Sequence, residues 1–326
     1  MEKELKWAVL GTGIIANEMA QALQKMGKKL YAVANRTYDK AVEFAEKYGA
    51  EKVYEKIDDM FTDKESDIIY ITTPHNTHIK FMLEALKNGK HVLCEKSITL
   101  NSEELEEAVK IAKEKNLILG EAMTIFNMPL YTKLSDIVNS GKLGDVKMIQ
   151  VNFGSYKEYD MNNRFFNRNL AGGALLDIGV YAISITRLFM TSKPDNVLSQ
   201  VKYAPTGVDE QVGIIMMNKE QQMSTIALTL HSKQPKRVVI ACEKAYIEVL
   251  EYPRADKAKI VYTETGEIEE IEEGITANAL QYEMQNMEKS VKSGINQMKL
   301  EYTRDVMDIM TNLRKEWGMT YPEEEM

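Results

Sequence analysis

The feature that most constrains the fold is a glycine-rich turn near the start of the chain. An apolar run at residues 6–10 leads directly into Gly11-Thr12-Gly13-Ile14-Ile15-Ala16, and an amphipathic stretch follows at residues 14–26. Strand, turn and helix in this order supply the structural context that a bare G-x-G-x-x-[GA] match lacks. The alternative interpretation is a glycine turn that joins two elements and binds no ligand.

The small residues of this turn have physical reasons if the turn binds a dinucleotide. Gly11 makes the tight turn, Gly13 lets the backbone approach a pyrophosphate, and Ala16 permits close packing of helix on sheet. The N-terminus of the helix then binds the phosphates. The sequence therefore predicts cofactor contacts from Gly11, Thr12, Gly13, Ile14 and Ile15.

Short apolar runs and longer amphipathic stretches alternate through the first 120 residues. The expected strands are residues 6–10, 30–35, 52–54, 67–73, 91–95 and 117–120, and the expected helices are residues 14–26, 39–48, 77–88 and 102–115. This alternation is typical of repeated βαβ units that build a parallel sheet. We therefore expect residues 1–121 to form a doubly wound, dinucleotide-binding domain.

The pattern changes after residue 120. Helices are expected at residues 130–140, 173–190, 276–293 and 303–317, and strands at residues 146–154, 197–203, 208–217, 223–230, 237–241, 246–250 and 259–263. Turn residues such as Pro205-Thr206-Gly207 separate the β segments. Residues 122–326 are therefore expected to form an α+β domain with a mostly antiparallel open sheet, so the fold class is α/β.

The end of the second expected strand indicates which nicotinamide cofactor is bound. An acid at this point grips the ribose 2′-hydroxyl of NAD, whereas an arginine suits the 2′-phosphate of NADP. The strand ends in Asn35-Arg36-Thr37, and the first carboxylate is Asp39. The guanidinium of Arg36 offers a fork for phosphate and a flat face for adenine. We expect NADP, with NAD as the alternative cofactor and a solvated basic loop as the alternative structure.

Ligands of open α/β sheets bind outside the carboxyl ends of the strands. This rule brings together three loops, Gly11 to Gly13, Thr73-Pro74-His75-Asn76 and Glu95-Lys96-Ser97, and we add His78 to the cofactor-binding set. Lys96 leaves its strand beside the predicted nicotinamide position, where a functional role is favoured over an ordinary surface lysine. His75 and His78 have no companion cysteine and no nearby acidic cluster, so no metal site is expected.

A second candidate site lies in residues 172–181, which read Gly-Gly-Ala-Leu-Leu-Asp-Ile-Gly-Val-Tyr. Asp177 and Tyr181 are four positions apart and would share one face of an α-helix. Their neighbours are apolar, so this face is expected to be covered, and a covered carboxylate needs partners. The alternative is an aspartate bonded to backbone amides and a tyrosine that only packs. Weaker candidates for contact with a substrate are Arg164, Phe165 and Phe153.

Charge and cysteine content exclude several classes of protein. Lys and Arg total 41 against 49 Asp and Glu, a net charge of −8, and the basic residues form no stripe. Such a chain lacks the electrostatic footprint of a nucleic-acid or membrane-surface binder. Its two cysteines exclude a disulfide framework. The few apolar residues before Gly11 are too short for a signal peptide, and no stretch approaches the roughly 20 residues of a membrane span. We expect a cytoplasmic protein.

Four motifs in order resemble the Gfo/Idh/MocA family of oxidoreductases: GTGIIA from Gly11, TPHNTH from Thr73, HVLCEKS from His91 and GGALLDIGVY from Gly172. The resemblance implies a Rossmann domain followed by an open-sheet domain that often dimerises through its outer face. It also implies hydride transfer between a nicotinamide cofactor and a secondary alcohol of a sugar, cyclitol or diol. Lys96 matches the lysine of the Glu-Lys-Pro motif, and Asp177 and Tyr181 match the pair on the helix of the second domain.

The chain departs from the family pattern at three positions. Ser97 stands where proline is usual. Tyr181 stands where inositol-dehydrogenase-like members have histidine, which points to the branch that includes dihydrodiol dehydrogenases and some aldose oxidoreductases. Thr124 stands where many of that branch have an aromatic residue, which favours a small sugar or polyol over an aromatic diol.

The leading hypothesis is an NADP(H)-dependent oxidoreductase that acts on a secondary hydroxyl or carbonyl of a small sugar, polyol or diol. Tyr181 is the expected general acid/base, and Lys96 and Asp177 prepare it. The rival is a cofactor-binding regulator of the same fold without turnover, and a biliverdin-reductase-like reaction is a third hypothesis. Poor alternation in residues 213–217 and 224–228 suggests a sheet covered on both faces, which predicts a homodimer or higher homo-oligomer; the alternative is a sheet fully buried within one subunit.

Overall fold

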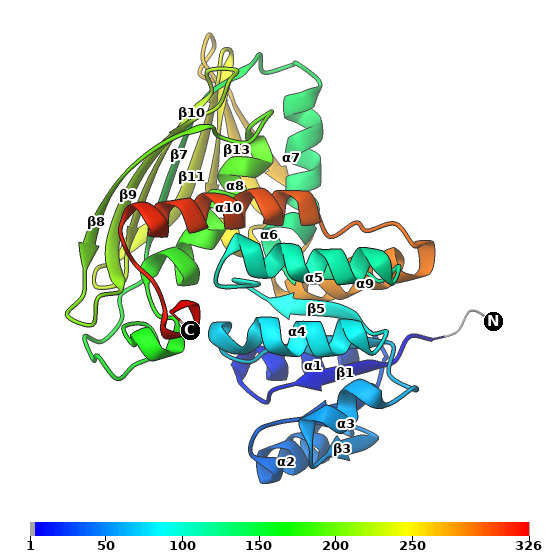
Figure 1. Ribbon diagram of the computed structural model, residues 1–326. Coiled ribbons are helices and arrows are strands. Elements are labelled where there is room, and N and C mark those ends of the chain that lie inside the picture. The colour runs from blue at the N-terminus through cyan, green and yellow to red at the C-terminus, as the bar shows by residue number, and fades with distance from the viewer. Residues whose placement is uncertain (1–3, 326) are drawn as a thin grey trace. The chain divides into compact units, whose positions relative to one another are not determined.

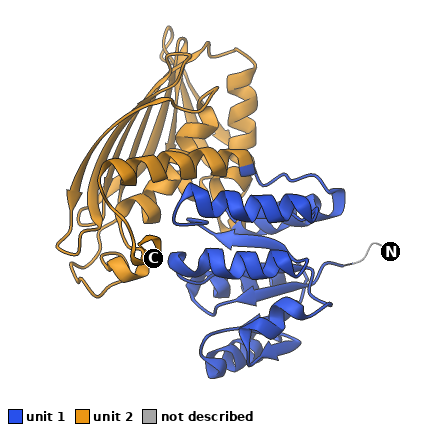
Figure 2. Ribbon diagram, viewed as in Figure 1, with its two compact units in different colours: residues 1–123, 280–300 blue, residues 124–279, 301–326 orange. Residues whose placement is uncertain are grey.

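The computed structural model describes residues 4–325, which divide into two compact units. Unit 1 comprises Met1–Met123 and Leu280–Leu300, and unit 2 comprises Thr124–Ala279 and Glu301–Met326 (Figure 2). The first three residues, which the sequence analysis placed in the first domain, lie outside the described residues. Near the centre of the chain the division falls between Met123 and Thr124, whereas Leu280–Leu300 returns to unit 1 from the region that the sequence assigned to the second domain.

Unit 1 is built on a six-stranded sheet in which every strand pair is parallel. Its strands are β1 (Trp7–Leu10), β2 (Leu30–Ala34), β3 (Lys52–Tyr54), β4 (Ile68–Ile71), β5 (His91–Glu95) and β6 (Leu119–Ala122). The order β3-β2-β1-β4-β5-β6 reverses direction beside β1, which confirms the doubly wound Rossmann arrangement. The residues of β1, β2 and β4 are all buried, as expected of a parallel sheet covered on both faces.

Helices connect these strands and pack on the sheet (Figure 1). They are α1 (Ile14–Lys25), α2 (Tyr38–Tyr48), α3 (Ile57–Thr62), α4 (His78–Lys87) and α5 (Ser102–Glu114). The side chain of Asn101 caps α5 by accepting a hydrogen bond from the amide of Glu104 at 2.9 Å. The short helix α3 was not expected, because six residues are too few to show a clear helical period.

Helix α9 (Ala279–Ser293) attaches to unit 1 through polar contacts that the sequence does not reveal. The indole Nε1 of Trp7 donates to Glu288 Oε1 at 2.9 Å, and the ammonium of Lys28 pairs with the same carboxylate. The segment after α9 packs against the end of the parallel sheet. Its Met298 lies so close to Gly120 in β6 that a Cβ on Gly120 would be 2.7 Å from the Met298 side chain. Trp7 and Glu288 are 281 positions apart, so no local pattern predicts their contact.

Unit 2 contains an eight-stranded sheet in the order β14-β13-β12-β11-β7-β10-β9-β8. The strands are β7 (Val146–Gly154), β8 (Asn196–Tyr203), β9 (Asp209–Met217), β10 (Met223–Thr229), β11 (Gln234–Cys242), β12 (Ala245–Leu250), β13 (Lys257–Tyr262) and β14 (Ile268–Glu272). Only β7 and β10 pair in parallel, which confirms a mostly antiparallel sheet. The sequence analysis missed β14, because three of its five residues are Glu, which strands disfavour, and its two Ile residues are three positions apart and so show no alternation.

The helices of unit 2 are α6 (Thr124–Asn127), α7 (Pro129–Asn139), α8 (Val180–Phe189) and α10 (Leu300–Glu316). Helix α8 packs on β7 and β10, and Arg187 on α8 forms an ion pair with Asp305 on α10 at 2.7 Å. Figure 1 shows α8 and α10 over the same face of the sheet. The four-residue helix α6 is a further element that the sequence did not predict.

The segment at residues 168–189 corrects the expectation that no stretch of the sequence approaches the length of a membrane span. Arg168–Phe189 is long and apolar enough to cross a membrane by length and composition alone, with a mean hydropathy of 1.3. Of its most apolar window, 83% is buried inside the structure. The core helix of a globular domain meets the same criterion, and the packing of α8 on β7 and β10 gives this segment that role in unit 2.

Candidate active site

The glycine turn after β1 has a conformation that requires glycine at its first position. Gly11 has φ +108°, and its amide donates to the carbonyl of Ala34 at 2.8 Å. A Cβ on Gly11 would lie 2.4 Å from Thr72 Oγ1. Both the backbone angle and the lack of space therefore exclude a side chain, for reasons internal to the fold.

Gly13 differs, because nothing in the fold requires it to be glycine. Its φ is −73°, and a Cβ there would meet no atom within 4 Å. Within the described residues no side chain caps α1, and Asn17 Nδ2 donates to the carbonyls of Thr12 and Gly13 at 3.2 and 2.9 Å. Ile14 beside it is 83% exposed. A braced turn with an open side and an uncapped helix N-terminus fits the pyrophosphate of a dinucleotide.

The loop after β2 presents a cation that is available to a ligand. Asn35 Nδ2 donates to the carbonyl of Thr37 at 3.0 Å and so shapes the loop. Arg36 and Thr37 are exposed. In the part of the chain that the structure describes, Arg36 has no hydrogen bond or ion pair with protein. Its guanidinium is therefore free to meet a 2′-phosphate.

The turn that carries Lys96 is held by two buried histidines. His75 Nε2 lies 3.1 Å from the carbonyl oxygen of Lys96, and His78 Nδ1 lies 3.0 Å from that of Ser97. The other ring nitrogen of His78 lies 2.7 Å from the carbonyl oxygen of Thr73. The amide of Ile98 completes the turn by donating to the buried Glu121 at 3.2 Å.

His78 has a structural position, although the sequence placed it among the cofactor contacts. It is fully buried, and burial lowers its pKa. A carbonyl oxygen only accepts, and a neutral imidazole has a single N–H, so neutral His78 donates to one of its two carbonyl neighbours at a time. His78 thus links the loop after β4 to the loop after β5.

The remaining predicted cofactor residues of unit 1 lie at the same two strand ends. Thr73 Oγ1 accepts from Thr77 Oγ1 at 2.8 Å, Pro74 is exposed, and Asn76 follows in the first turn before α4. Glu95 accepts from the hydroxyl of Tyr70. Lys96 is half-buried, and the peptide bond between Lys96 and Ser97 is cis.

In unit 2 the Gly172-Gly173 pair starts the helix that bears Asp177 and Tyr181. A Cβ on Gly172 would lie 2.7 Å from the carbonyl oxygen of Arg164, and Gly173 has φ +124°. The first turn, Leu175–Gly179, is π-helical, and α8 continues it. In this turn the amide of Val180 donates to the carbonyl of Leu175, five residues earlier. The sequence analysis assumed a regular α-helix, so the angle between Asp177 and Tyr181 differs from that assumption.

Asp177 and Tyr181 occupy different environments on this helix. Asp177 is buried, and its Oδ1 lies 3.6 Å from Arg164 Nη2. Within residues 171–186 every residue is buried except Tyr181, which is half-buried. The rings of Tyr181 and Phe153 are 6.1 Å apart. Tyr181 is therefore partly accessible at the start of α8, and Asp177 in the preceding turn has a cationic partner.

The three weaker substrate candidates also lie in unit 2. Arg164 stacks its guanidinium 4.1 Å from the centre of the Phe165 ring, and Lys157 Nζ lies 4.1 Å from the same ring. Phe153 is buried, and Lys236 Nζ lies 5.4 Å from its ring. Arg164 therefore joins the loop before Gly172 to Asp177.

Sequence reasoning missed two residues that hold the start of this helix. The buried Asp209 accepts from the amide of Leu175 through Oδ2 at 2.6 Å. Burial raises the pKa of Asp209 to about 7, against the opposing effect of backbone amides and Arg314. The hydroxyl of Tyr321 donates to the carbonyl of Gly172 at 2.7 Å. Neither residue lies in a recognisable motif, so no sequence signal could have found them.

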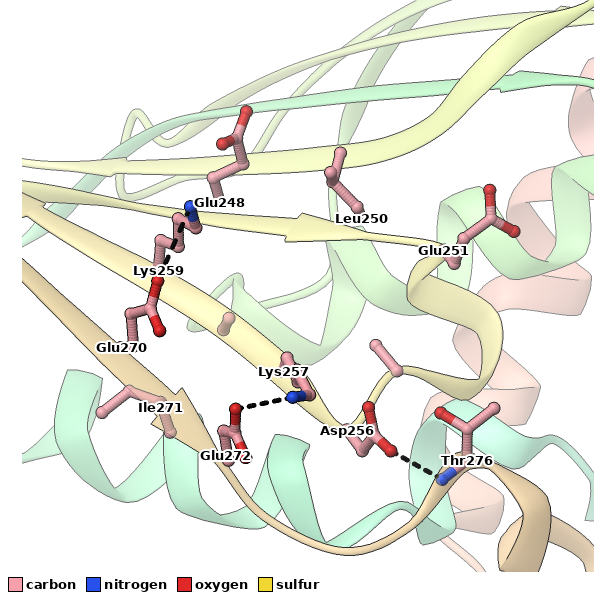
Figure 3. Close-up of a pocket in the computed structure, with 12 residues that line it drawn as sticks. Glu248, Leu250, Glu251, Asp256, Lys257, Lys259, Glu270, Ile271, Glu272 and Thr276 are labelled. Atoms are coloured by element: carbon pink, nitrogen blue, oxygen red, sulfur yellow. Dashed lines mark hydrogen bonds and ion pairs between the residues drawn. The ribbon is translucent and has the colours of Figure 1, made fainter.

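A groove elsewhere in unit 2 contains none of the predicted site residues. It has a volume of about 340 Å³ and lies along β12, β13 and β14 (Figure 3). Its walls carry cross-strand ion pairs, Lys257 with Glu272 at 2.7 Å and Lys259 with Glu270 at 3.7 Å.

Thr124, which the sequence analysis compared with an aromatic residue of related enzymes, does not line this groove. It is buried, and its hydroxyl donates to the carbonyl of Pro253.

Comparison with known families identifies both halves of the chain. Residues 5–123 match the model described as "Oxidoreductase family, NAD-binding Rossmann fold", and residues 131–248 match the "GFO/IDH/MocA C-terminal domain". The chain belongs to the Gfo/Idh/MocA family. This membership confirms the resemblance that the four sequence motifs indicated, and it makes the protein an oxidoreductase with a nicotinamide-dinucleotide site.

Relatives in the family cover the full length of the chain. A trans-1,2-dihydrobenzene-1,2-diol dehydrogenase of Xenopus laevis is 28% identical over 329 residues, which are 97% of this chain and 99% of the relative. The enzyme of the same name from Homo sapiens is 26% identical over 332 residues, 98% of this chain and 99% of its own. The chain thus matches the dihydrodiol dehydrogenase branch.

Solved structures of the same fold include a ketoreductase and a dehydrogenase. A 3-ketoreductase from Actinomadura kijaniata in complex with NADP and TDP-benzene has a TM-score of 0.84 at 19% identity, covering 95% of this chain and 96% of its own. A levoglucosan dehydrogenase in complex with NADH and levoglucosan has a TM-score of 0.83 at 17% identity, covering 95% and 98%. At this identity the likeness concerns the fold.

Proposed function

We propose that this Gfo/Idh/MocA protein is an NADP(H)-preferring oxidoreductase that acts on a secondary hydroxyl or carbonyl of a small sugar, polyol or diol. The substrate class is supported by the names of its relatives, which are diol dehydrogenases, and by the 3-ketoreductase and the levoglucosan dehydrogenase that share its fold. When bound, the nicotinamide ring accepts or supplies the hydride. The preference for NADP(H) is supported by Arg36, which is exposed at the end of β2 with no carboxylate beside it.

Residues of the chain supply the proton transfer that accompanies the hydride. Oxidation of an alcohol requires its hydroxyl proton to leave, and a free phenol with a pKa of about 10 is a poor base at neutral pH. We assign the proton exchange to Tyr181 and the stabilisation of negative charge on the substrate oxygen and phenolate to Lys96. Asp177, already paired with Arg164, orients cationic groups of this machinery.

The observation that carries this proposal is the exposure of Tyr181. Tyr181 is half-buried between residues 171–180 and 182–186, which are all buried, and it stands at the position of the family's catalytic side chain. The other substrate contacts that we propose are Arg164, Phe165 and Phe153.

The test is a panel of polyols, aldoses and diols assayed for formation of NADPH, followed by two variants on the best substrate. Tyr181→Phe should lower kcat by about 10² to 10⁴-fold and leave the affinity for NADP(H) unchanged, because general acid/base catalysis contributes about that factor. Lys96→Met should be at least as damaging. Tyr203→Phe, which alters an exposed tyrosine on β8 outside the proposed site and the proposed dimer face, is the matched control. If Tyr181→Phe keeps the kcat of wild type, Tyr181 is not the general acid/base. If wild type binds the nucleotide but turns over no substrate of the panel, the result supports a cofactor-binding regulator instead of an enzyme.

We further propose that the outer face of the unit 2 sheet binds a second copy of the chain. Alternate residues of its strands are apolar and exposed: Met148, Leu198, Ile215, Met223, Tyr246 and Leu250. Leu198 is directly opposite Ile215, and Met148 is opposite Met223, so these side chains form a continuous surface. An apolar sheet face of this kind favours association with an identical face.

Light scattering tests the dimer directly. Wild type should have twice the chain mass of 37.2 kDa at micromolar concentration. Ile215→Asp should shift the particle toward the monomer, whereas Ile295→Asp, at a residue 68% exposed in unit 1, should not. A wild-type mass of one chain refutes the proposal. We also propose a cytoplasmic location, which is supported by two free cysteines and testable by cell fractionation.

A further inference from the structure

Asp209 is a buried carboxylate that the proposed reaction does not use. It is the first residue of β9 and has no exposed surface. Its Oδ2 accepts from the amide of Leu175 at 2.6 Å, and the backbone amides of Ala174 and of Asp209 itself also favour its charged form. A carboxylate that is fully buried is costly even when amides face it, so its presence calls for a physical reason.

The position of Asp209 is that of a helix cap supplied by another element. The amides at the start of a helix have no acceptor within the helix and favour a negative group. Ala174 precedes the π-helical turn that begins at Leu175, and its side chain has no oxygen to act as a cap. Asp209 provides this acceptor from the neighbouring strand.

The backbone before this turn is shaped to admit the Asp209 carboxylate. A Cβ on Gly173 would lie 2.1 Å from Asp209 Oδ1, and Gly173 has φ +124°. Tyr321 holds the preceding residue through its bond to the carbonyl of Gly172. The Asp209 carboxylate beside Gly173 and the Tyr321 hydroxyl bonded to Gly172 therefore fix the backbone where the helix starts.

We propose that Asp209 is a positioning residue which, through Leu175, sets the start of the helix that carries Asp177 and Tyr181. Leu175 is two residues before Asp177 and six before Tyr181, so a shift of its amide moves both side chains. The inference rests on the proposed function, because it gives Asp209 a role only if those two residues act on the substrate.

The charge of Asp209 changes near neutral pH. Burial raises its pKa to about 7, and the groups that face it are Arg314 from α10 and Tyr321 from the C-terminal segment. Arg314 is itself paired with Glu324 at 2.7 Å. The ionised carboxylate is the stronger acceptor for an amide. The hydrogen bond from the Leu175 amide to Asp209 is consequently stronger above pH 7 than below it.

Two variants separate the acceptor from the charge. Asp209→Asn retains an oxygen for the amide of Leu175 but cannot ionise, whereas Asp209→Ala removes the acceptor. The matched control is Ser224→Ala, since the Ser224 hydroxyl is buried in the same sheet with no partner in the described residues. Each protein is assayed for kcat and KM on the best substrate from pH 5.5 to 9, for affinity toward NADPH, and for thermal unfolding.

Asp209→Ala should lose roughly tenfold in kcat, because a displaced Tyr181 is no longer aligned with the substrate, with little change in affinity for NADPH. Asp209→Asn should keep kcat within about threefold at pH 8 and lack a titration near pH 7 that wild-type kcat/KM shows. A residue that serves only stability would shift the unfolding temperature and leave both kcat and the pH profile as in wild type. If Asp209→Ala does not fold, the pH profile of Asp209→Asn decides alone.

The inference is overturned if the pH profile of Asp209→Asn superimposes on that of wild type and kcat does not fall in Asp209→Ala. Tyr181→Phe, measured in parallel, distinguishes this result from failure of the proposed function. Wild-type activity in Tyr181→Phe means that the helix does not carry the reaction. An inactive Tyr181→Phe with unaffected Asp209 variants refutes only the positioning role.

Discussion

Replacement of Gly13 by alanine should separate cofactor binding from folding. In the free protein the new Cβ meets no atom within 4 Å, and φ is −73°, which alanine adopts without strain. A Gly→Ala change at such a site stabilises by about 0.4 to 1 kcal/mol through the unfolded chain. Alanine is a poorer N-cap than glycine by about as much. The free energy of unfolding should therefore change by less than about 1 kcal/mol, or roughly 2 to 4 °C in the unfolding temperature.

The affinity for the cofactor should fall sharply in the same variant. If the pyrophosphate approaches the backbone at Gly13, the added methyl group displaces it from the amides at the start of α1. Loss of one charge-assisted hydrogen bond costs about 1.5 to 3 kcal/mol, which is roughly a ten- to hundredfold rise in Kd. The assay is fluorescence titration with NADPH, alongside thermal unfolding without ligand.

Gly11→Ala is the matched control, because it places the same methyl group two residues earlier. There φ is +108° and the Cβ would lie 2.4 Å from Thr72 Oγ1, so we expect a loss of more than about 2 kcal/mol of stability from strain and overlap. An unchanged Kd in Gly13→Ala, or a loss of stability as large as that of Gly11→Ala, would refute the reasoning.

Three further predictions concern charged residues. Arg36→Ala should weaken NADPH binding by about tenfold or more and leave NADH binding unchanged, because only the 2′-phosphate needs its guanidinium; titration of both cofactors decides. Asp209, whose pKa of about 7 in the folded protein exceeds its ordinary value of 3.8, favours folding below about pH 4 and loses that contribution as pH rises through 7. Urea unfolding of Asp209→Asn should therefore show a gain relative to wild type that grows by on the order of 2 kcal/mol between pH 5 and pH 8, and a constant difference contradicts this. Glu288→Gln, which removes the charge that pairs with Lys28, should lower the free energy of unfolding measured in urea by about 2 kcal/mol without changing kcat. An unchanged free energy of unfolding means that the ion pair makes no net contribution to stability.

Local sequence patterns were sufficient for most elements of unit 1. The boundaries of β3 and β5 agree with the expected ranges, and those of α1 and α5 agree to within one residue at each end. These elements have strong periods and clear terminal residues, such as the Asn101 cap of α5. Such signals act within a few positions of the chain, so they can be read without knowledge of the fold. Short or highly charged elements such as α3 and β14 lack them.

The candidate site divides in the same way. Gly11 and Gly13 belong to one motif, yet the sequence could not show that the fold requires glycine at Gly11 alone, because the obstacle is the side chain of Thr72, which follows β4. His78 was predicted from its loop to contact cofactor, but packing buries it against two carbonyl groups. A motif places residues near a site, and only the packed structure shows which atoms face the ligand.

By itself the sequence determined the order of the longer strands and helices, the glycine turn and the family to which Lys96, Asp177 and Tyr181 point. Only the tertiary structure decided that Leu280–Leu300 belongs to unit 1 and that Asp209 caps the helix of Tyr181. The physical reason is the range of the interactions. Propensity and period are local, whereas the bonds from Trp7 to Glu288 and from Leu175 to Asp209 join residues 281 and 34 positions apart, and they exist only once the chain has folded.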